Sequence, residues 1–107
     1  MIVLSATWVE QEDSYTAQGY DIFAGESKVG TMSVFIDTDS AYIERIDIHE
    51  ESRSNGYGTE AIRTIASEHK ETFAAPDNEG SRRLMDRIGT VTDRHGEVNQ
   101  GFGVYEF

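Results

Sequence analysis

Two glycines near the middle of the chain, Gly56 and Gly58, mark the stretch best suited to chemistry. An alternating apolar run at 42–48 precedes them, and a run with helical periodicity follows them. Glycine lets a backbone turn tightly and approach a ligand closely, and the first N–H groups of a helix lack partners within it. Those groups and the helix dipole favour a bound phosphate. The order strand, glycine loop, helix therefore predicts a site for a phosphate-bearing ligand.

The length and the charge of the chain limit its class. Its 107 residues suffice for one domain with a modest core, which we expect to span residues 1–107. The formal net charge of −11 argues against a nucleic-acid partner, whose phosphates it would repel, and suits a cationic partner such as an amine. A surface that serves only solubility, or a saline habitat, explains the same charge.

The composition also fits a cytoplasmic protein without a bound metal. The chain has no cysteine, so disulfides and thiolate metal sites are excluded. No apolar run is long enough to span a bilayer, and the first residues lack the basic leader of a signal peptide. His49 begins no zinc motif, because no second histidine follows at helical spacing. We therefore predict no membrane partner and no metal site.

The spacing of apolar residues predicts a sheet into which helices are inserted late. Alternation and turn residues indicate four strands in an antiparallel meander, with a polar loop at 10–18 between the first two. Helical spacing then indicates two helices around a short fifth strand, and the tail at 90–107 suggests a hairpin with its turn near 95–96 or 100–101. The expected strands are 2–9, 19–24, 29–37, 41–49 and 71–75, and the expected helices are 58–70 and 78–88. This order predicts an α+β, or mixed α/β, domain.

A second motif starts at Asn78, which can cap the second helix, and includes Ser81. The two motifs and the order of elements resemble the GNAT superfamily of acyl-CoA-dependent N-acetyltransferases. Arg53, Gly56 and Gly58 match that family's loop motif of arginine or glutamine, two residues, glycine, one residue, and glycine or alanine. The family's helix motif, an asparagine with alanine or serine three residues later, matches Asn78 and Ser81. The resemblance covers roughly residues 19–89.

The resemblance implies a GNAT-like central sheet, mostly antiparallel, with two main helices. It also implies acetyl-CoA as the cofactor, with its pyrophosphate on the amides of residues 54–59 and its pantetheine arm along the strand at 46–48. A backbone amide at the end of that strand would polarise the thioester carbonyl, and no metal is needed. The implied cofactor-binding residues are Ile46, Ile48, Arg53, Ser54, Asn55, Gly56, Tyr57, Gly58, Thr59, Asn78 and Ser81.

The chain departs from the family's pattern at positions that affect catalysis. Met85 stands where many members have a tyrosine that protonates the leaving thiolate, and Thr90 replaces a phenylalanine. The loop at 10–18 is too short for the two helices that the family usually has between its first and second strands. The resemblance thus implies a minimal member, whose acceptor site is either open or completed by a second subunit in a homodimer.

Two residues are candidates for proton transfer. Glu44 shares a strand face with Tyr42, Ile46 and Ile48 in the alternating pattern, and its carboxylate suits a base that takes a proton from an ammonium. The alternative for Glu44 is an ion pair with a cation across the sheet. Tyr105 would replace the missing acid if its strand lies beside the thioester, and otherwise packs at the sheet edge.

Four arginines have two interpretations each. Arg53 either braces the glycine loop or contacts a phosphate. The second helix carries a basic patch of Arg82, Arg83 and Arg87. This patch either contacts the adenosine 3′-phosphate of coenzyme A or is a solvated face.

We expect an enzyme that transfers an acetyl group from acetyl-CoA to a primary amine by direct attack in a ternary complex. The acceptor is then an amine-bearing small molecule or a protein. The alternative is a non-catalytic GNAT-like module that binds acyl-CoA or regulates another protein. A nucleotide on the same cradle is a third interpretation, but no P-loop lysine stands next to Gly58, which argues against a nucleoside triphosphatase.

Overall fold

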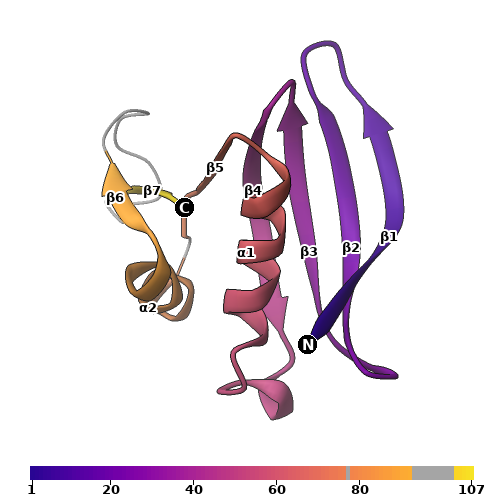
Figure 1. Cartoon of the computed structure of the whole chain (residues 1–107), viewed down its shortest axis with the longest axis vertical. Helices are drawn as coiled ribbons and strands as arrows, with labels where there is room; N and C mark the ends of the chain where they lie inside the picture. The colour runs from indigo at the N-terminus through magenta and orange to yellow at the C-terminus, as the bar shows by residue number, and fades with distance from the viewer. Residues whose placement is uncertain (77, 93–102) are drawn as a thin grey trace.

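The computed structural model describes residues 1–76, 78–92 and 103–107. Within these residues the chain forms a seven-stranded sheet with the order β1-β2-β3-β4-β5-β7-β6 (Figure 1). Neighbouring strands are antiparallel except β4 and β5, which are parallel. The strands are β1 (Ile2–Gln11), β2 (Thr16–Ala24), β3 (Ser27–Asp37), β4 (Ser40–Ile48), β5 (Glu71–Ala74), β6 (Thr90–Thr92) and β7 (Val104–Glu106). The predicted mixed, mostly antiparallel class is confirmed.

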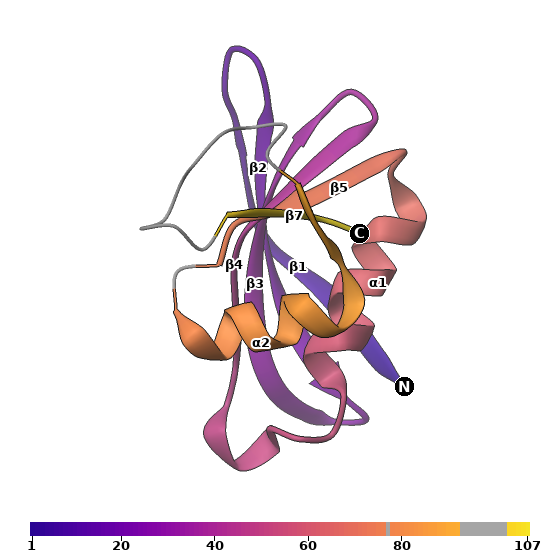
Figure 2. The same cartoon turned by 90° about the vertical axis from the view of Figure 1, so that its left-hand side faces the viewer.

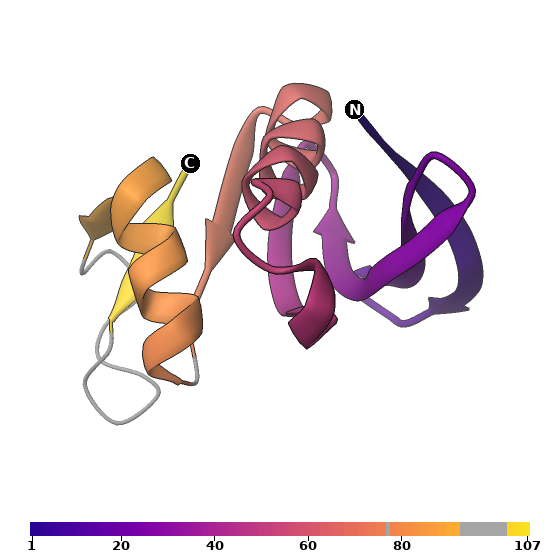
Figure 3. The same ribbon diagram turned by 90° about the horizontal axis from the view of Figure 1, so that it is seen from below.

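Two α-helices, α1 (Tyr57–Glu68) and α2 (Glu79–Ile88), and a short 3-10 turn, η1 (Glu50–Ser52), complete the described part. Helix α1 lies over one face of the sheet. Helix α2 begins near the other face and runs toward α1, past the place where β4 and β5 separate (Figures 2 and 3). The apolar stripe predicted for α1 is buried, since Ala61, Ile62 and Ile65 have no exposed surface. Neither helix is long and apolar enough to cross a membrane.

The main core lies between α1 and the sheet, and α2 closes one end of it. Met85 of α2 is buried in this core, with Leu84 and Ile88 packed against it. A smaller apolar cluster lies on the other face of the sheet, where Phe73, Ala75 and Val104 are buried and Tyr42 packs on them. Burial on both faces of the sheet explains why three of the four residues of β5, Thr72, Phe73 and Ala74, are buried.

The hairpin of β1 and β2 is longer than the sequence predicted. Its ladder continues through Glu10, paired with Ala17, to Gln11, paired with Thr16, so the loop prediction for 10–18 is wrong. Polar residues can continue these strands because β1 is an edge strand and its side chains here are exposed. The connection between β1 and β2 is short and contains no helix, as expected from the spacing in the sequence.

A β-bulge interrupts β4 at Glu44. Ser33 pairs with Arg45 and Val34 pairs with Ile43, so that Glu44 has no partner residue on β3. One extra residue inverts the alternation of side chains beyond it. Residues Tyr42 and Glu44 therefore lie on the face away from α1, whereas Ile46 and Ile48 pack on the core that α1 covers. The expectation that these four side chains share one face is wrong, because regular alternation does not allow for the bulge.

The bulge also marks the place where β4 and β5 separate. The parallel ladder ends with Ile43 paired to Ala74, so the backbone of β4 beyond the bulge has no described strand beside it on that side. The tail pairs as a hairpin of β6 and β7, and β7 also pairs with β5. The predicted turn of this hairpin lies outside the described residues. Divergence of β4 from β5 leaves an open strand edge between α1 and α2.

Candidate functional site

A groove of about 440 Å³ runs along the open edge of β4. The loop before α1, the first turn of α1 and the inner side of α2 form its other walls. The lining residues are Ile46, Asp47, Ile48, Arg53, Ser54, Gly56, Tyr57, Gly58, Thr59, Asn78, Gly80, Ser81, Arg83, Leu84 and Arg87. The structure thus brings together all the predicted cofactor-binding residues except Asn55, and their individual roles stay predictions.

The loop from β4 to α1 is held by two side chains. Arg53 Nε donates to the carbonyl oxygen of Ile48 at 2.9 Å, and its Nη2 lies 3.7 Å from Asp47 Oδ1. Asn55 Nδ2 donates to the carbonyl oxygens of Ser52 at 2.9 Å and Arg53 at 3.3 Å, so the Asn55 amide points back into the loop. Arg53 therefore braces the loop against the end of β4, which was one of its two predicted roles.

The two motif glycines serve different purposes. Gly56 is the N-cap of α1 with φ of 80°, and a Cβ there would meet nothing within 4 Å. It offers no side chain to the N–H groups of the first turn, so these face the groove without a cap. A Cβ on Gly58 would lie 2.9 Å from Leu84 Cδ2 and 3.7 Å from Ile48 Cγ1. Gly58 thus lets α1, α2 and β4 meet closely at the back of the groove.

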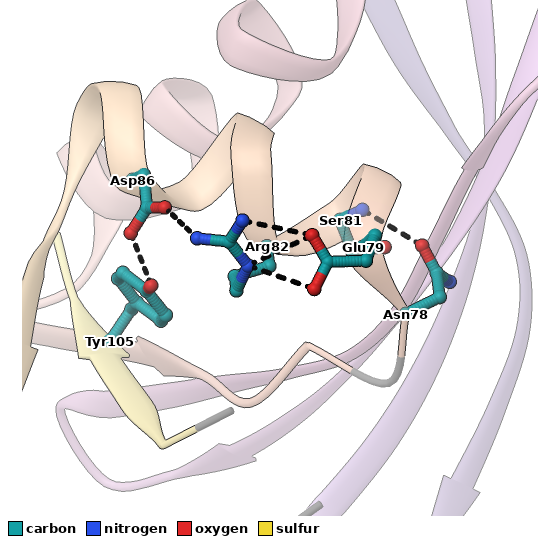
Figure 4. A network of polar contacts seen from close by, with 6 residues as sticks. All are labelled: Asn78, Glu79, Ser81, Arg82, Asp86 and Tyr105. Carbon is teal, nitrogen blue, oxygen red and sulfur yellow. Dashed lines mark hydrogen bonds and ion pairs between the residues drawn. The ribbon is translucent and has the colours of Figure 1, made fainter. Parts of the chain in front are cut away.

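The start of α2 forms the facing wall. Asn78 is its N-cap, and the Asn78 Oδ1 accepts a hydrogen bond of 2.8 Å from the backbone N–H of Ser81, as the capping prediction required (Figure 4). Both residues line the groove. The cap fixes the direction in which α2 leaves the open edge of β4.

The three arginines of α2 do not form one patch. Arg82 is held by Glu79 at 2.8 Å and by Asp86 at 2.5 Å (Figure 4), and its hydrogen bond lowers the pKa of the exposed Glu79 carboxyl. Arg83 and Arg87 instead line the groove. With Arg53, they give the described lining of the groove three cations and one carboxylate, that of Asp47, in a protein whose net charge is −11. This local excess of positive charge suits an anionic ligand.

Glu44 lies at the inner end of the groove. A recess of about 20 Å³ adjoins the bulge, lined by Ile43, Glu44, Arg45, Ile46, Ala75, Pro76, Ser81 and Met85, and it shares Ile46 and Ser81 with the groove. The exposed Glu44 carboxylate accepts a hydrogen bond of 2.9 Å from Ser33 Oγ. No ion pair in the described part of the chain engages Glu44, so the structure offers no support for the alternative of a cross-strand salt bridge.

Tyr105 occupies a different place. Its side chain is buried between β7 and α2, where the hydroxyl donates to Asp86 (Figure 4). Burial, and then the Asp86 carboxylate, raise the pKa of Tyr105. Tyr105 lines neither the groove nor the recess, whereas Met85 lines the recess. The role of Tyr105 as the acid stays a prediction, and its hydroxyl would first have to leave Asp86.

Sequence reasoning missed the partnership of Ser33 with Glu44. A signal for it existed: Glu44 and Arg45 are consecutive polar residues within an otherwise alternating apolar strand. Such a break is typical of a bulge, which re-aims a side chain next to a site. Recognising the bulge from this break would also have placed Ile46 and Ile48 on the face of the sheet that α1 covers.

Comparison with known proteins gives one family and several solved structures. The model of the Acetyltransferase (GNAT) family matches residues 4–90. A GNAT family acetyltransferase from Elizabethkingia anophelis with acetyl-CoA bound is 13% identical with a TM-score of 0.65, and the match covers 99% of this chain and 97% of that one. An acetyltransferase from Thermus thermophilus is 15% identical with a TM-score of 0.64, over 85% of this chain and 63% of that one.

A third structure, the PaiA N-acetyltransferase from Thermoplasma acidophilum in complex with coenzyme A, is 15% identical with a TM-score of 0.61, over 84% of this chain and 59% of that one. The chain thus spans less than two thirds of the length of the Thermus and Thermoplasma proteins. At these identities the likeness is one of fold. None of the curated protein sequences matches the chain.

Proposed function

The chain belongs to the GNAT family of acetyltransferases, and from that premise we propose that it transfers an acetyl group from acetyl-CoA to a primary amine. The observation that carries the proposal is the groove. It joins an open strand edge, an uncapped helix N-terminus and three arginines in one continuous surface. A nucleotide with a long amide-bearing arm is the kind of ligand that needs all three.

The residues present fit coenzyme A. The N–H groups of Tyr57, Gly58 and Thr59 would bind the pyrophosphate, since they are oriented along the helix and lack a cap. The edge of β4 at Ile46 and Ile48 would pair with the amides of the pantetheine arm in the manner of an added strand. The volume of about 440 Å³ falls within the ordinary range for ligand sites.

When bound, the coenzyme supplies an acyl group already activated as a thioester. The chain's own residues then orient the reactants and move protons. Glu44, held by Ser33 at the recess, accepts a proton from the acceptor ammonium, and the amine nitrogen then attacks the acetyl carbon. The C–N bond forms as the C–S bond breaks, the electron pair stays on sulfur, and the thiolate takes the second proton that the nitrogen loses. Ammonium and thioester thus give an amide, a thiol and one released proton.

Calorimetry and an activity assay test this function together. Acetyl-CoA and desulfo-CoA should bind the purified protein with micromolar affinity, and free thiol should appear when acetyl-CoA and an amine are both present. If neither coenzyme binds, the proposal is overturned. The replacement of the usual tyrosine by Met85 favours a second candidate, a non-catalytic acyl-CoA-binding module. That candidate predicts tight coenzyme binding and no thiol release with any amine.

We expect Arg83 and Arg87 to bind the 3′-phosphate of coenzyme A, because both line the groove on α2. Replacing either with alanine should weaken coenzyme A about 10- to 100-fold, as expected for a charge-assisted hydrogen bond of about 1.5–3 kcal/mol. Binding of dephospho-CoA, which lacks that phosphate, should change little. Calorimetry with both ligands measures the difference.

The matched control for charge is Arg63→Ala, because Arg63 is exposed on α1 and does not line the groove. It should bind both ligands as the parent protein does. An equal loss for coenzyme A and dephospho-CoA in the Arg83 and Arg87 variants would place these arginines elsewhere on the ligand, and no loss would remove them from the site.

A further inference from the structure

Partly exposed aromatic side chains form a strip on the face of the sheet away from α1. The rings of Phe35 and Tyr42, on paired positions of β3 and β4, are stacked with centroids 6.3 Å apart and planes 13° apart. Tyr15, in the connection before β2, packs on Phe35 with centroids 5.0 Å apart and a tilt of 51°. Tyr42 continues the strip to the buried Phe73. We call Tyr15, Phe35 and Tyr42 the aromatic strip.

Glu44 stands at one end of the aromatic strip. It follows Tyr42 by two residues on the same face, and burial, with the Glu44 carboxylate as the second cause, raises the pKa of Tyr42. The hydrogen bond from Ser33 Oγ holds Glu44 in place, while the carboxylate remains exposed. The same carboxylate lines the recess that adjoins the inner end of the groove. Strip, carboxylate and groove therefore meet at the bulge.

Two carboxylates on β4 and β2 are already paired with cations. Asp47 lies 3.7 Å from Arg53, and Asp21 lies 3.2 Å from Lys28. Arg45, which pairs with Ser33 across the ladder, adds a positive charge on the side of Glu44 away from the aromatic strip. A second ammonium beyond Glu44 would therefore meet a cation and a neutralised carboxylate in one direction, and aromatic rings in the other.

We propose that the aromatic strip binds the apolar or aromatic group that carries the acceptor amine, while Glu44 binds the ammonium. This inference rests on the proposed acetyl transfer and names its acceptor class: a small primary amine on an apolar or aromatic chain, and not a polyamine. The ammonium gains the carboxylate of Glu44, and an apolar or aromatic chain buries its apolar surface on the rings.

A series of amines tests the proposal. In acetylation assays, kcat/KM should rise about threefold for each methylene from butylamine to octylamine while the chain covers the rings, and 2-phenylethylamine should exceed butylamine about tenfold. Spermidine should be no better than butylamine. Tyr15→Ala, at an exposed position, should flatten the dependence on chain length. A flat series, or a preference for spermidine, would overturn the inference.

A matched control and a binding measurement separate this inference from the proposed function. Val9→Ala removes an exposed apolar side chain from the same hairpin and should keep the full dependence on chain length. The ring resonances of the aromatic strip should shift on titration with octylamine at concentrations where butylamine has no effect, without any turnover. Binding without acetylation of any amine would defeat the proposed function alone. Acetylation of all amines alike would defeat the inference alone.

Discussion

The Gly56→Trp variant should lose coenzyme A binding by about 100-fold or more while remaining folded. Position 56 has φ of 80°, so a tryptophan there carries about 1–2 kcal/mol of backbone strain or shifts the loop. The indole also occupies the mouth of the helix N-terminus, where phosphate would bind. Two lost charge-assisted hydrogen bonds of about 1.5–3 kcal/mol each account for this loss of affinity. Calorimetry with acetyl-CoA measures the affinity.

The control for this variant is built into the chain. Gly25, in the turn between β2 and β3, has φ of 64° and, like Gly56, nothing within 4 Å of a built Cβ. Gly25→Trp therefore brings the same bulk and comparable strain outside the groove. Both variants should lose similar free energy of unfolding, but only Gly56→Trp should lose coenzyme binding. Equal binding by both variants would remove the glycine loop from the cofactor site.

The Glu44→Gln variant should lower kcat for amine acetylation by about 10²–10⁴-fold, the usual contribution of a general base. Glutamine keeps the size of the side chain and can still accept from Ser33 Oγ, which lies 2.9 Å from the native carboxylate. It cannot accept a proton. The loss should therefore be smaller for weakly basic amines that are already neutral at the pH of the assay. Steady-state kinetics on a strongly and a weakly basic amine measure the difference.

A second acidic residue separates this role from simple charge steering. Glu10 is an exposed carboxylate whose position on β1 pairs with Ala17, far from the bulge in the sheet order. Glu10→Gln makes the same change in net charge and should leave kcat as it is. The Glu44 variant should also keep its affinity for acetyl-CoA, because Glu44 does not line the groove. An unchanged kcat in Glu44→Gln would exclude it as the base.

Local patterns in the sequence were sufficient to predict those parts of the site that depend on residues close together in the chain. The loop between β4 and α1, the cap at Asn78 and the buried stripe of α1 each depend on residues within a few positions of one another. Their chemistry can therefore be read from spacing alone. This covers the cofactor side of the groove almost entirely.

The acceptor side depends on contacts that are distant in the chain. The bulge at Glu44 becomes certain only when β3 and β4 are set in register, and the stacking of Tyr15 on Phe35 requires the hairpin of β1 and β2 to be longer than its polar sequence suggested. The hydroxyl of Tyr105 meets Asp86 across 19 positions of sequence, through the packing of β7 on α2. Alternation and propensity carry no information on such pairings.

The divergence of β4 and β5 has a kinetic consequence. A coenzyme in the groove would reach the bulge from the side of α1 and α2, and an amine on the aromatic strip would reach it from the opposite face of the sheet. Neither ligand then blocks the entrance of the other. If the chain transfers acetyl groups as proposed, we therefore expect the two substrates to add in either order and the two products to leave independently, which is a random-order kinetic mechanism.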